Sequence, residues 1–215
     1  PGTNCEYDTK YAFEQLGCEV EIIWHKEKNI PADTDLLVIP GGFSYGDYLR
    51  SGAIARFANI MESVQEYAAK GGKVLGICNG FQILLEAGLL PGAMKRNDSL
   101  HFISKYHTLK VVNTDNTFLS LLNKDDVLNI PVAHHDGNYY IDADGLKELE
   151  NNNQILLKYC DKDGNLVNMN GSVSNIAGIC NKEKNVFGLM PHPERAIEEL
   201  LGSIDGVNML KGFLQ

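Results

Sequence analysis

The chain has 215 residues, a hydrophobic share of 44% and a formal net charge of −9, which suit a globular protein with its own core. An acidic chain is a poor partner for nucleic acid, because phosphate binding needs a clustered basic surface. No apolar run reaches the ~18 residues that a membrane span needs, and the five cysteines are widely spaced, which is typical of a reducing compartment. We therefore expect a cytoplasmic protein that binds neither nucleic acid nor a membrane.

The first half of the chain alternates predicted strands and helices. Residues 20–24 alternate apolar and polar side chains, as in a half-buried strand. The apolar runs 35–39 and 73–77 suit strands that are buried on both faces. From apolar spacing and following glycines, helices are predicted over 9–16, 52–69 and 81–87.

The second half is richer in predicted strands, over 107–113, 131–141, 154–159, 173–180 and 186–190. It ends with predicted helices near 196–201 and 205–214. The polar stretch 148–153 is predicted to be a surface turn. The alternation predicts an α/β fold, flavodoxin-like, with an open, mostly parallel, twisted sheet, helices on both faces and extra strands in the second half.

The segment Gly76-Ile77-Cys78-Asn79-Gly80 follows a predicted buried strand and opens a predicted helix. This is the context of a nucleophile elbow, in which glycines permit a tight turn beside the nucleophile. At the amino end of a helix, the helix dipole favours the reactive thiolate. We therefore interpret Cys78 as a nucleophile, although a structural cysteine in a glycine-rich turn has the same pattern.

A base for this thiol is predicted in the segment Pro191-His192-Pro193-Glu194-Arg195. Residues before proline favour extended geometry, in which residues two apart face the same side. His192 and Glu194 could then share a face, with the carboxylate fixing the imidazole tautomer. The alternative is a capping histidine and a surface glutamate.

Backbone amides for an oxyanion are predicted after the strand 35–39, where the segment Pro40-Gly41-Gly42-Phe43 begins. Glycines there let N–H groups point at a ligand, and the amide of Asn79 would supply a second donor. The segment lacks the signature of a phosphate-binding loop.

Together, these segments resemble the class I, triad-type glutamine amidotransferases. Within that family, the resemblance extends to the branch that serves de novo purine biosynthesis. The matching segments are 1–5, 41–53, 96–102, 170–172 and 176–179, with the last match at Arg195.

The resemblance implies a single amidotransferase domain over 1–215 and a role for each matching residue. The implied roles are nucleophile for Cys78, base and acid for His192, orienting carboxylate for Glu194, oxyanion hole for Gly42, Phe43 and Asn79, and substrate binding for Gln82, His135 and Asp136.

The resemblance also implies a reaction and its partners. Glutamine would be hydrolysed to glutamate and ammonia through a thioester. The ammonia would pass to a large synthetase subunit, which uses ATP and magnesium to convert formylglycinamide ribonucleotide into the amidine. A small third subunit would bridge the two, and this chain itself would hold no cofactor.

The chain departs from the family pattern in two places. The family has a strand before segment 1–5, so we expect that strand to be missing at the N-terminus. Residues 134–138 read His-His-Asp-Gly-Asn, where the family has His-Gly-Glu-Gly-Arg. Neighbouring residues on a strand point to opposite faces, so His134 and His135 are poorly placed to share a metal ion, and no metal site is expected.

Three alternatives remain open from the sequence. The chain could serve another synthetase, or it could be a DJ-1/PfpI-like cysteine hydrolase, although such enzymes lack the His-Pro-Glu element near the carboxyl end. It could also be a non-catalytic relative, against which the intact Cys78, His192 and Glu194 speak.

Overall fold

The computed structural model describes residues 2–215, so Pro1 of segment 1–5 lies outside the described residues. The first half forms α1 (Glu6–Gln15), β1 (Leu36–Ile39), α2 (Ile60–Ala69), β2 (Lys73–Ile77) and α3 (Asn79–Glu86). The second half forms β3 (Ala93–Lys95), β4 (Ile103–Val111), β5 (Val127–His134), β6 (Asn138–Tyr140), α4 (Ala143–Asn151), β7 (Ile155–Cys160), β8 (Ile176–Cys180), β9 (Val186–Leu189) and α5 (Gly206–Lys211).

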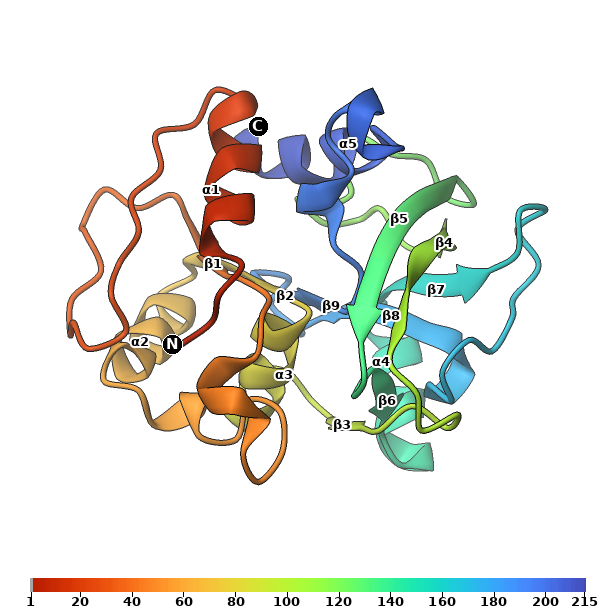
Figure 1. The fold of residues 1–215 in the computed structure, drawn as a ribbon, viewed down its shortest axis with the longest axis horizontal. Coiled ribbons are helices and arrows are strands. Elements are labelled where there is room, and N and C mark those ends of the chain that lie inside the picture. The colour runs from red at the N-terminus through yellow and green to blue at the C-terminus, as the bar shows by residue number, and fades with distance from the viewer. Residues whose placement is uncertain (1) are drawn as a thin grey trace.

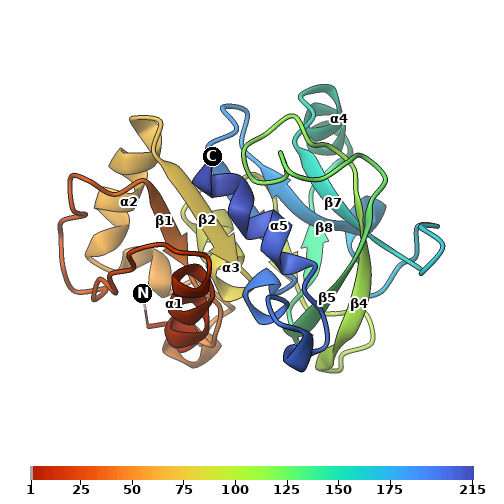
Figure 2. The same ribbon diagram turned by 90° about the horizontal axis from the view of Figure 1, so that it is seen from above.

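A seven-stranded sheet organises the molecule, in the order β1-β2-β9-β8-β7-β4-β5, and β3 pairs with β6 separately. Figure 1 shows α1 and α5 above the β1–β2–β9 part of the sheet and α3 below it. In Figure 2, which views the molecule from above, α1 and α5 lie on the side nearest the viewer. The predicted α/β fold with helices on both faces is therefore confirmed.

The sheet is mixed, which corrects the expectation of a mostly parallel one. Strands β1, β2 and β9 run parallel, whereas every later pairing in the sheet is antiparallel. Parallel neighbours need a long crossover connection, usually a helix, and the second half has few helices between its strands. Its extra strands therefore add to the sheet as antiparallel neighbours.

The curl of this sheet brings its far edge back to the first half. Strand β5 is the last in the order, yet the His192 amide, just after β9, donates to the Pro131 carbonyl of β5 at 2.8 Å. Pro131 has no N–H to donate to a neighbouring strand, which suits the edge position of β5. The curl thus places β5 beside the end of β9.

Several predicted elements are shorter or absent. Residues 20–24 join no strand among the described residues, and the exposed side chains of Ile22 and Trp24 show that the predicted buried face does not form. The predicted helix 52–69 is interrupted by the extended residue Ala58, so α2 begins only at Ile60, after a 3₁₀ turn at Ala55–Phe57.

In the second half, the predicted strand 131–141 is divided into β5 and β6 by the turn at 135–137. The surface turn predicted at 148–153 is wrong, because α4 continues to Asn151. The helix predicted at 196–201 is a 3₁₀ turn over Glu199–Leu201, whereas the last predicted helix corresponds to α5 and the 3₁₀ turn that follows it.

The core lies on both sides of the sheet, as its buried strands require. All residues of β8 and β9 and the last four residues of β2 are buried, which matches their apolar runs. Within residues 2–215, every helix is too short or too polar to cross a membrane.

Candidate active site

Cys78 stands in the turn between β2 and α3, as the elbow pattern predicts. Its backbone is left-handed, with φ 50° and ψ −105°, a conformation that is costly for a residue with a side chain. The Cys78 amide donates to the Leu189 carbonyl of β9 at 2.8 Å, and the Cys78 carbonyl accepts from the Gln82 amide at 3.1 Å. These two bonds hold the strained turn in place.

The two glycines of the elbow are required by close contacts. A Cβ at Gly76 would lie 2.7 Å from the backbone of Gly80, and a Cβ at Gly80 would lie 1.9 Å from the Ile39 carbonyl oxygen. The amino end of α3 therefore packs directly on β1 and β2. Side chains at either position would push the helix, and Cys78 with it, off the sheet.

His192 and Glu194 form the pair that the sequence predicts. Their Nδ1 and Oε1 atoms lie 2.7 Å apart, and both side chains are buried. The route differs from the predicted extended segment, because Pro193–Arg195 forms a 3₁₀ turn. Burial alone would lower the pKa of His192, but the charges of Glu194 and Cys78 and the hydrogen bond to Glu194 raise it to about 10.

The thiol and the imidazole meet at Gly41. A Cβ there would lie 2.8 Å from His192 Cε1 and 3.5 Å from Cys78 Cβ, so the glycine leaves room for both side chains. The Cys78 Sγ also lies 3.6 Å from the Ala133 carbonyl of β5. The site therefore joins β2, β9 and β5, which are far apart in the sequence.

Two of the three predicted oxyanion donors are available. The Phe43 amide donates to Asn4 Oδ1 at 2.9 Å, which corrects its predicted role. The amides of Gly42 and Asn79 have no acceptor within residues 2–215. A Cβ at Gly42, where φ is 132°, would lie 2.1 Å from Asn4 Oδ1, so Asn4 packs against this loop. In the sequence, the only indication of a role for Asn4 was its position in the matching segment 1–5.

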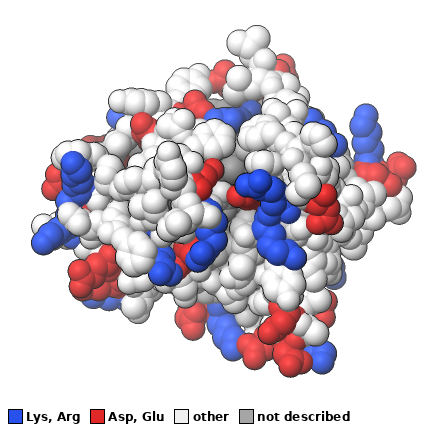
Figure 3. Space-filling model, turned by 60° about the horizontal axis from the view of Figure 1, so that its bottom comes forward, with Lys and Arg blue, Asp and Glu red and all other residues white. Residues whose placement is uncertain are grey.

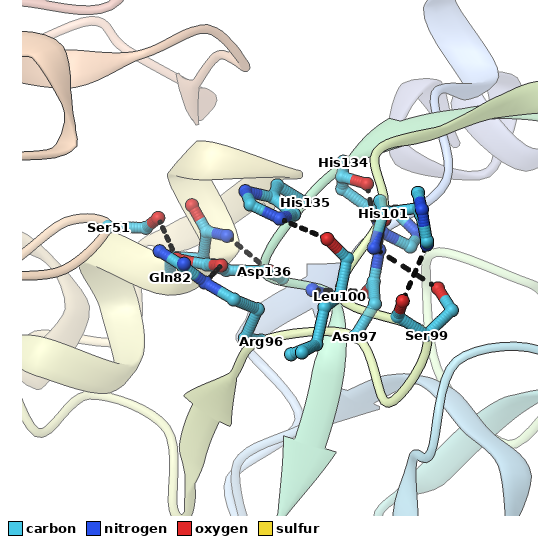
Figure 4. Close-up of polar contacts among 11 residues, drawn as sticks. Ser51, Gln82, Arg96, Asn97, Ser99, Leu100, His101, His134, His135 and Asp136 are labelled. Carbon is cyan, nitrogen blue, oxygen red and sulfur yellow. Dashed lines mark hydrogen bonds and ion pairs between the residues drawn. The ribbon is translucent and has the colours of Figure 1, made fainter.

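Two of the predicted substrate-binding residues, Gln82 and Asp136, belong to one hydrogen-bond network (Figure 4). Gln82 Nε2 donates to the Asp136 carbonyl at 2.6 Å, and Gln82 Oε1 accepts from Asn79 Nδ2 at 2.8 Å. The Asp136 carboxylate accepts from Ser51 Oγ at 2.9 Å and from Arg96 Nε at 3.3 Å. The amide of Gln82 thus fixes the 134–137 turn.

The two neighbouring histidines have different surroundings. His134 is buried and its Nδ1 contacts Asn97 Oδ1 at 3.1 Å, whereas His135 Nε2 contacts the Leu100 carbonyl at 3.1 Å. Among residues 2–215 no three His, Cys, Asp or Glu side chains gather as metal ligands.

The other four cysteines fall into two groups. Cys160 and Cys180 are buried and Cys18 is partly buried, in keeping with packing roles. Cys5 lies near the site, where its Sγ accepts from Arg195 Nη2 at 3.1 Å. Burial raises the pKa of the Cys5 thiol to about 11, so this thiol stays protonated at neutral pH.

The surface offers no basic patch on the face drawn in Figure 3, where acidic and basic side chains are interspersed.

Comparisons with known proteins support the same family. A family model described as a CobB/CobQ-like glutamine amidotransferase domain matches residues 1–208. A relative from Sulfurimonas denitrificans, named phosphoribosylformylglycinamidine synthase subunit PurQ, is 69% identical over 215 residues, covering 100% of this chain and 96% of the relative. A relative of the same name from Wolinella succinogenes is 63% identical, covering 99% of this chain and 95% of its own.

A solved structure of PurLQS from Thermotoga maritima contains a similar chain. It matches with a TM-score of 0.88 and 42% identity, covering 100% of this chain and 93% of that chain. A glutamine amidotransferase structure from the same organism shares the fold, with a TM-score of 0.61 at 14% identity. The chain therefore belongs to the glutamine amidotransferase family of the PurQ subunits of phosphoribosylformylglycinamidine synthase.

Proposed function

We propose that this chain hydrolyses glutamine to glutamate and ammonia through a thioester on Cys78. The observation that carries the proposal is the buried His192–Glu194 pair, 2.7 Å apart, which shares the space beside Gly41 with the elbow thiol. A positioned base and an orienting carboxylate are what a weak nucleophile needs. The raised pKa of His192 favours its imidazolium form at neutral pH.

The chemistry follows from the positions of these groups. The Cys78 thiolate attacks the side-chain amide carbon of glutamine, and the amides of Gly42 and Asn79 stabilise the oxyanion. His192 gives its proton to the leaving nitrogen, the C–N bond breaks, and ammonia leaves a γ-glutamyl thioester. Water then attacks the thioester, His192 takes the proton, and the C–S bond breaks to release glutamate.

The substrate lies, in this proposal, between the elbow and the 134–137 turn. Asp136 and His135 supply polar groups to the amino-acid end of glutamine. Gln82 acts indirectly, by holding the turn in place, since both ends of its side-chain amide are already bonded to Asn79 and to the Asp136 carbonyl.

The ammonia serves a synthetase partner. The complex of the Thermotoga maritima relative supports two partners for this chain, a large synthetase subunit and a small third subunit. The large subunit would use ATP and magnesium to convert formylglycinamide ribonucleotide into formylglycinamidine ribonucleotide, and this chain would contribute no cofactor. The proposed location of the complex is the cytoplasm.

The test measures ammonia and glutamate from glutamine with the chain and its synthetase subunits, and amidine formation with ATP. Cys78→Ala is expected to abolish glutamine-dependent synthesis but to keep synthesis from added ammonia. Glutamine-dependent synthesis by Cys78→Ala at the wild-type rate would overturn the assignment of the nucleophile.

A further inference from the structure

Asn97 is fully buried and uses its whole side-chain amide beside the active site (Figure 4). Its Nδ2 donates to the carbonyls of His101, at 2.9 Å, and His134, at 3.0 Å. Its Oδ1 accepts from the Gly137 amide at 3.1 Å and contacts His134 Nδ1 at 3.1 Å. The backbone amide of Asn97 also donates to the His135 carbonyl at 2.9 Å.

These bonds join the turn that carries His135 and Asp136 to the rest of the site. The same turn is held at Asp136 by Gln82 and at the Gly137 carbonyl by Asn170 Nδ2, at 2.7 Å. A Cβ at Gly137 would lie 2.2 Å from His134 Nδ1, so the turn packs directly on the imidazole. Asn97 contacts both the turn and that ring.

The contacts of Asn97 also define the tautomer of His134. Both partners of Nδ2 are carbonyl oxygens, which only accept, so the nitrogen must face them. The opposite atom, Oδ1, can only accept as well. His134 Nδ1 must therefore carry a proton, so the neutral ring has its lone pair on Nε2.

His134 Nε2 is buried and has no hydrogen-bond partner among the described residues. The groups that face His134 are His192 from the segment after β9, Asp136 from its own turn and Asn97 from the 96–101 segment. Burial and the charge of His192 lower the pKa of His134 to about 4. A neutral histidine thus lies near the histidine that carries the charge.

We propose that Asn97 is a positioning residue, which holds the substrate-binding turn 134–137 and keeps His134 as a neutral Nδ1–H imidazole close to His192. A second imidazolium at His134 would disfavour the charge on His192 that the leaving nitrogen requires. The proposal rests on the proposed glutaminase function and adds a residue to it.

The kinetic test uses Asn97→Ala in the complex with the synthetase subunits. Losing three side-chain contacts to residues 134–137 is expected to raise KM for glutamine by about tenfold or more, with a smaller change in kcat. Asn185→Ala is the matched control. That buried amide also donates to two carbonyls, of Ala68 and Gly72, but away from the site, so it should lower thermal stability without changing KM.

The tautomer test uses Asn97→Asp and nitrogen-15 NMR of the histidine rings in the full chain. Wild-type His134 is expected to stay an Nδ1–H tautomer between about pH 5 and pH 8, whereas a carboxylate at 97 should make it titrate in that range. The kcat/KM profile of Asn97→Asp should gain the same ionisation. His134→Asn keeps a neutral donor for residue 97, so adding it to Asn97→Asp should remove that ionisation.

Two results would overturn the inference: wild-type His134 titrating near the ordinary histidine pKa, or an unchanged KM in a folded Asn97→Ala variant. The NMR result does not depend on activity. Absence of glutaminase activity in the wild-type complex would instead contradict the proposed function, which keeps the two failures apart.

Discussion

The backbone of Cys78 is strained, and the contacts around it keep the residue in the conformation that its proposed role requires. Its left-handed backbone costs on the order of 1–3 kcal/mol, which the surrounding contacts must offset. The Leu189 carbonyl, the first turn of α3 and the close packing of Gly80 on β1 together provide them. The thiol is thereby directed toward His192.

Glu194→Gln tests the electrostatic role of the carboxylate. The amide keeps the shape but removes the negative charge that raises the pKa of His192, so that pKa should fall from about 10. His192 would then lose its proton at lower pH, and the alkaline limb of the kcat profile should move down. We expect kcat at neutral pH to fall by about 10²-fold or more. An unchanged alkaline limb would rule out this role.

Gly80→Ala tests the packing of the elbow. Its Cβ would lie 1.9 Å from the Ile39 carbonyl, in rigid backbone, so we expect a loss of about 3 kcal/mol or more in unfolding free energy. Gly88→Ala is the control, since a Cβ there meets nothing within 4 Å and only its φ of 72° opposes alanine, at about 1–2 kcal/mol. If the two variants lost equal amounts of unfolding free energy, measured by denaturant unfolding, the proposed packing of Gly80 on β1 would be contradicted.

Among the elements, those with a strong local pattern were predictable. Strand β2 has its predicted bounds, and Cys78, His192 and Glu194 lie in short motifs that could be found in the sequence. Residues 20–24 have the period of a strand but join no neighbour, and pairing depends on the whole fold. The contacts of Asn4 and Asn97 join segments far apart in the chain, so local patterns could not reveal them.

Helix α4 was missed although it has a clear start signal. Asp142 caps it, with its side chain accepting from the Gly145 amide at 2.8 Å. Asp142→Ala should lower the unfolding free energy by about 1 kcal/mol, because the amide loses its partner. Asp144→Ala, at an exposed position in the first turn, should change it less. A smaller loss from Asp142→Ala than from Asp144→Ala would show that the cap does not stabilise the helix.

At the scale of the whole molecule, the curled sheet lets both halves of the chain build one site. The Pro131 and Ala133 carbonyls of the edge strand contact the His192 amide and the Cys78 thiol. The family model that matches residues 1–208 describes an amidotransferase domain, and the PurLQS structure supports a synthetase partner for the proposed synthesis. The 69% identity to a PurQ subunit disfavours the alternatives of another synthetase or a DJ-1/PfpI-like hydrolase.

Leu49→Asp tests where that partner binds. Leu49 is 90% exposed on the loop that also carries Phe43, and the Ser44 amide of this loop donates to Asn79 Oδ1. In the proposed reaction, ammonia must pass from this region to the synthetase without being lost to solvent. A charge there should weaken binding of the synthetase subunits by about tenfold or more, measured as Kd. Leu200→Asp is the control, since Leu200 is 92% exposed in the Glu199–Leu201 turn, where the Leu201 carbonyl accepts from the Tyr106 hydroxyl of β4. Equal effects on Kd would contradict this surface.

The thioester on Cys78 is tested most directly by stopping the reaction with labelled glutamine in denaturant and locating the label by mass spectrometry. We expect a glutamyl group on the peptide that contains Cys78, as a thioester that hydroxylamine removes, and no such group in Cys78→Ala. Label on another cysteine, or wild-type glutamine hydrolysis by Cys78→Ala, would contradict it.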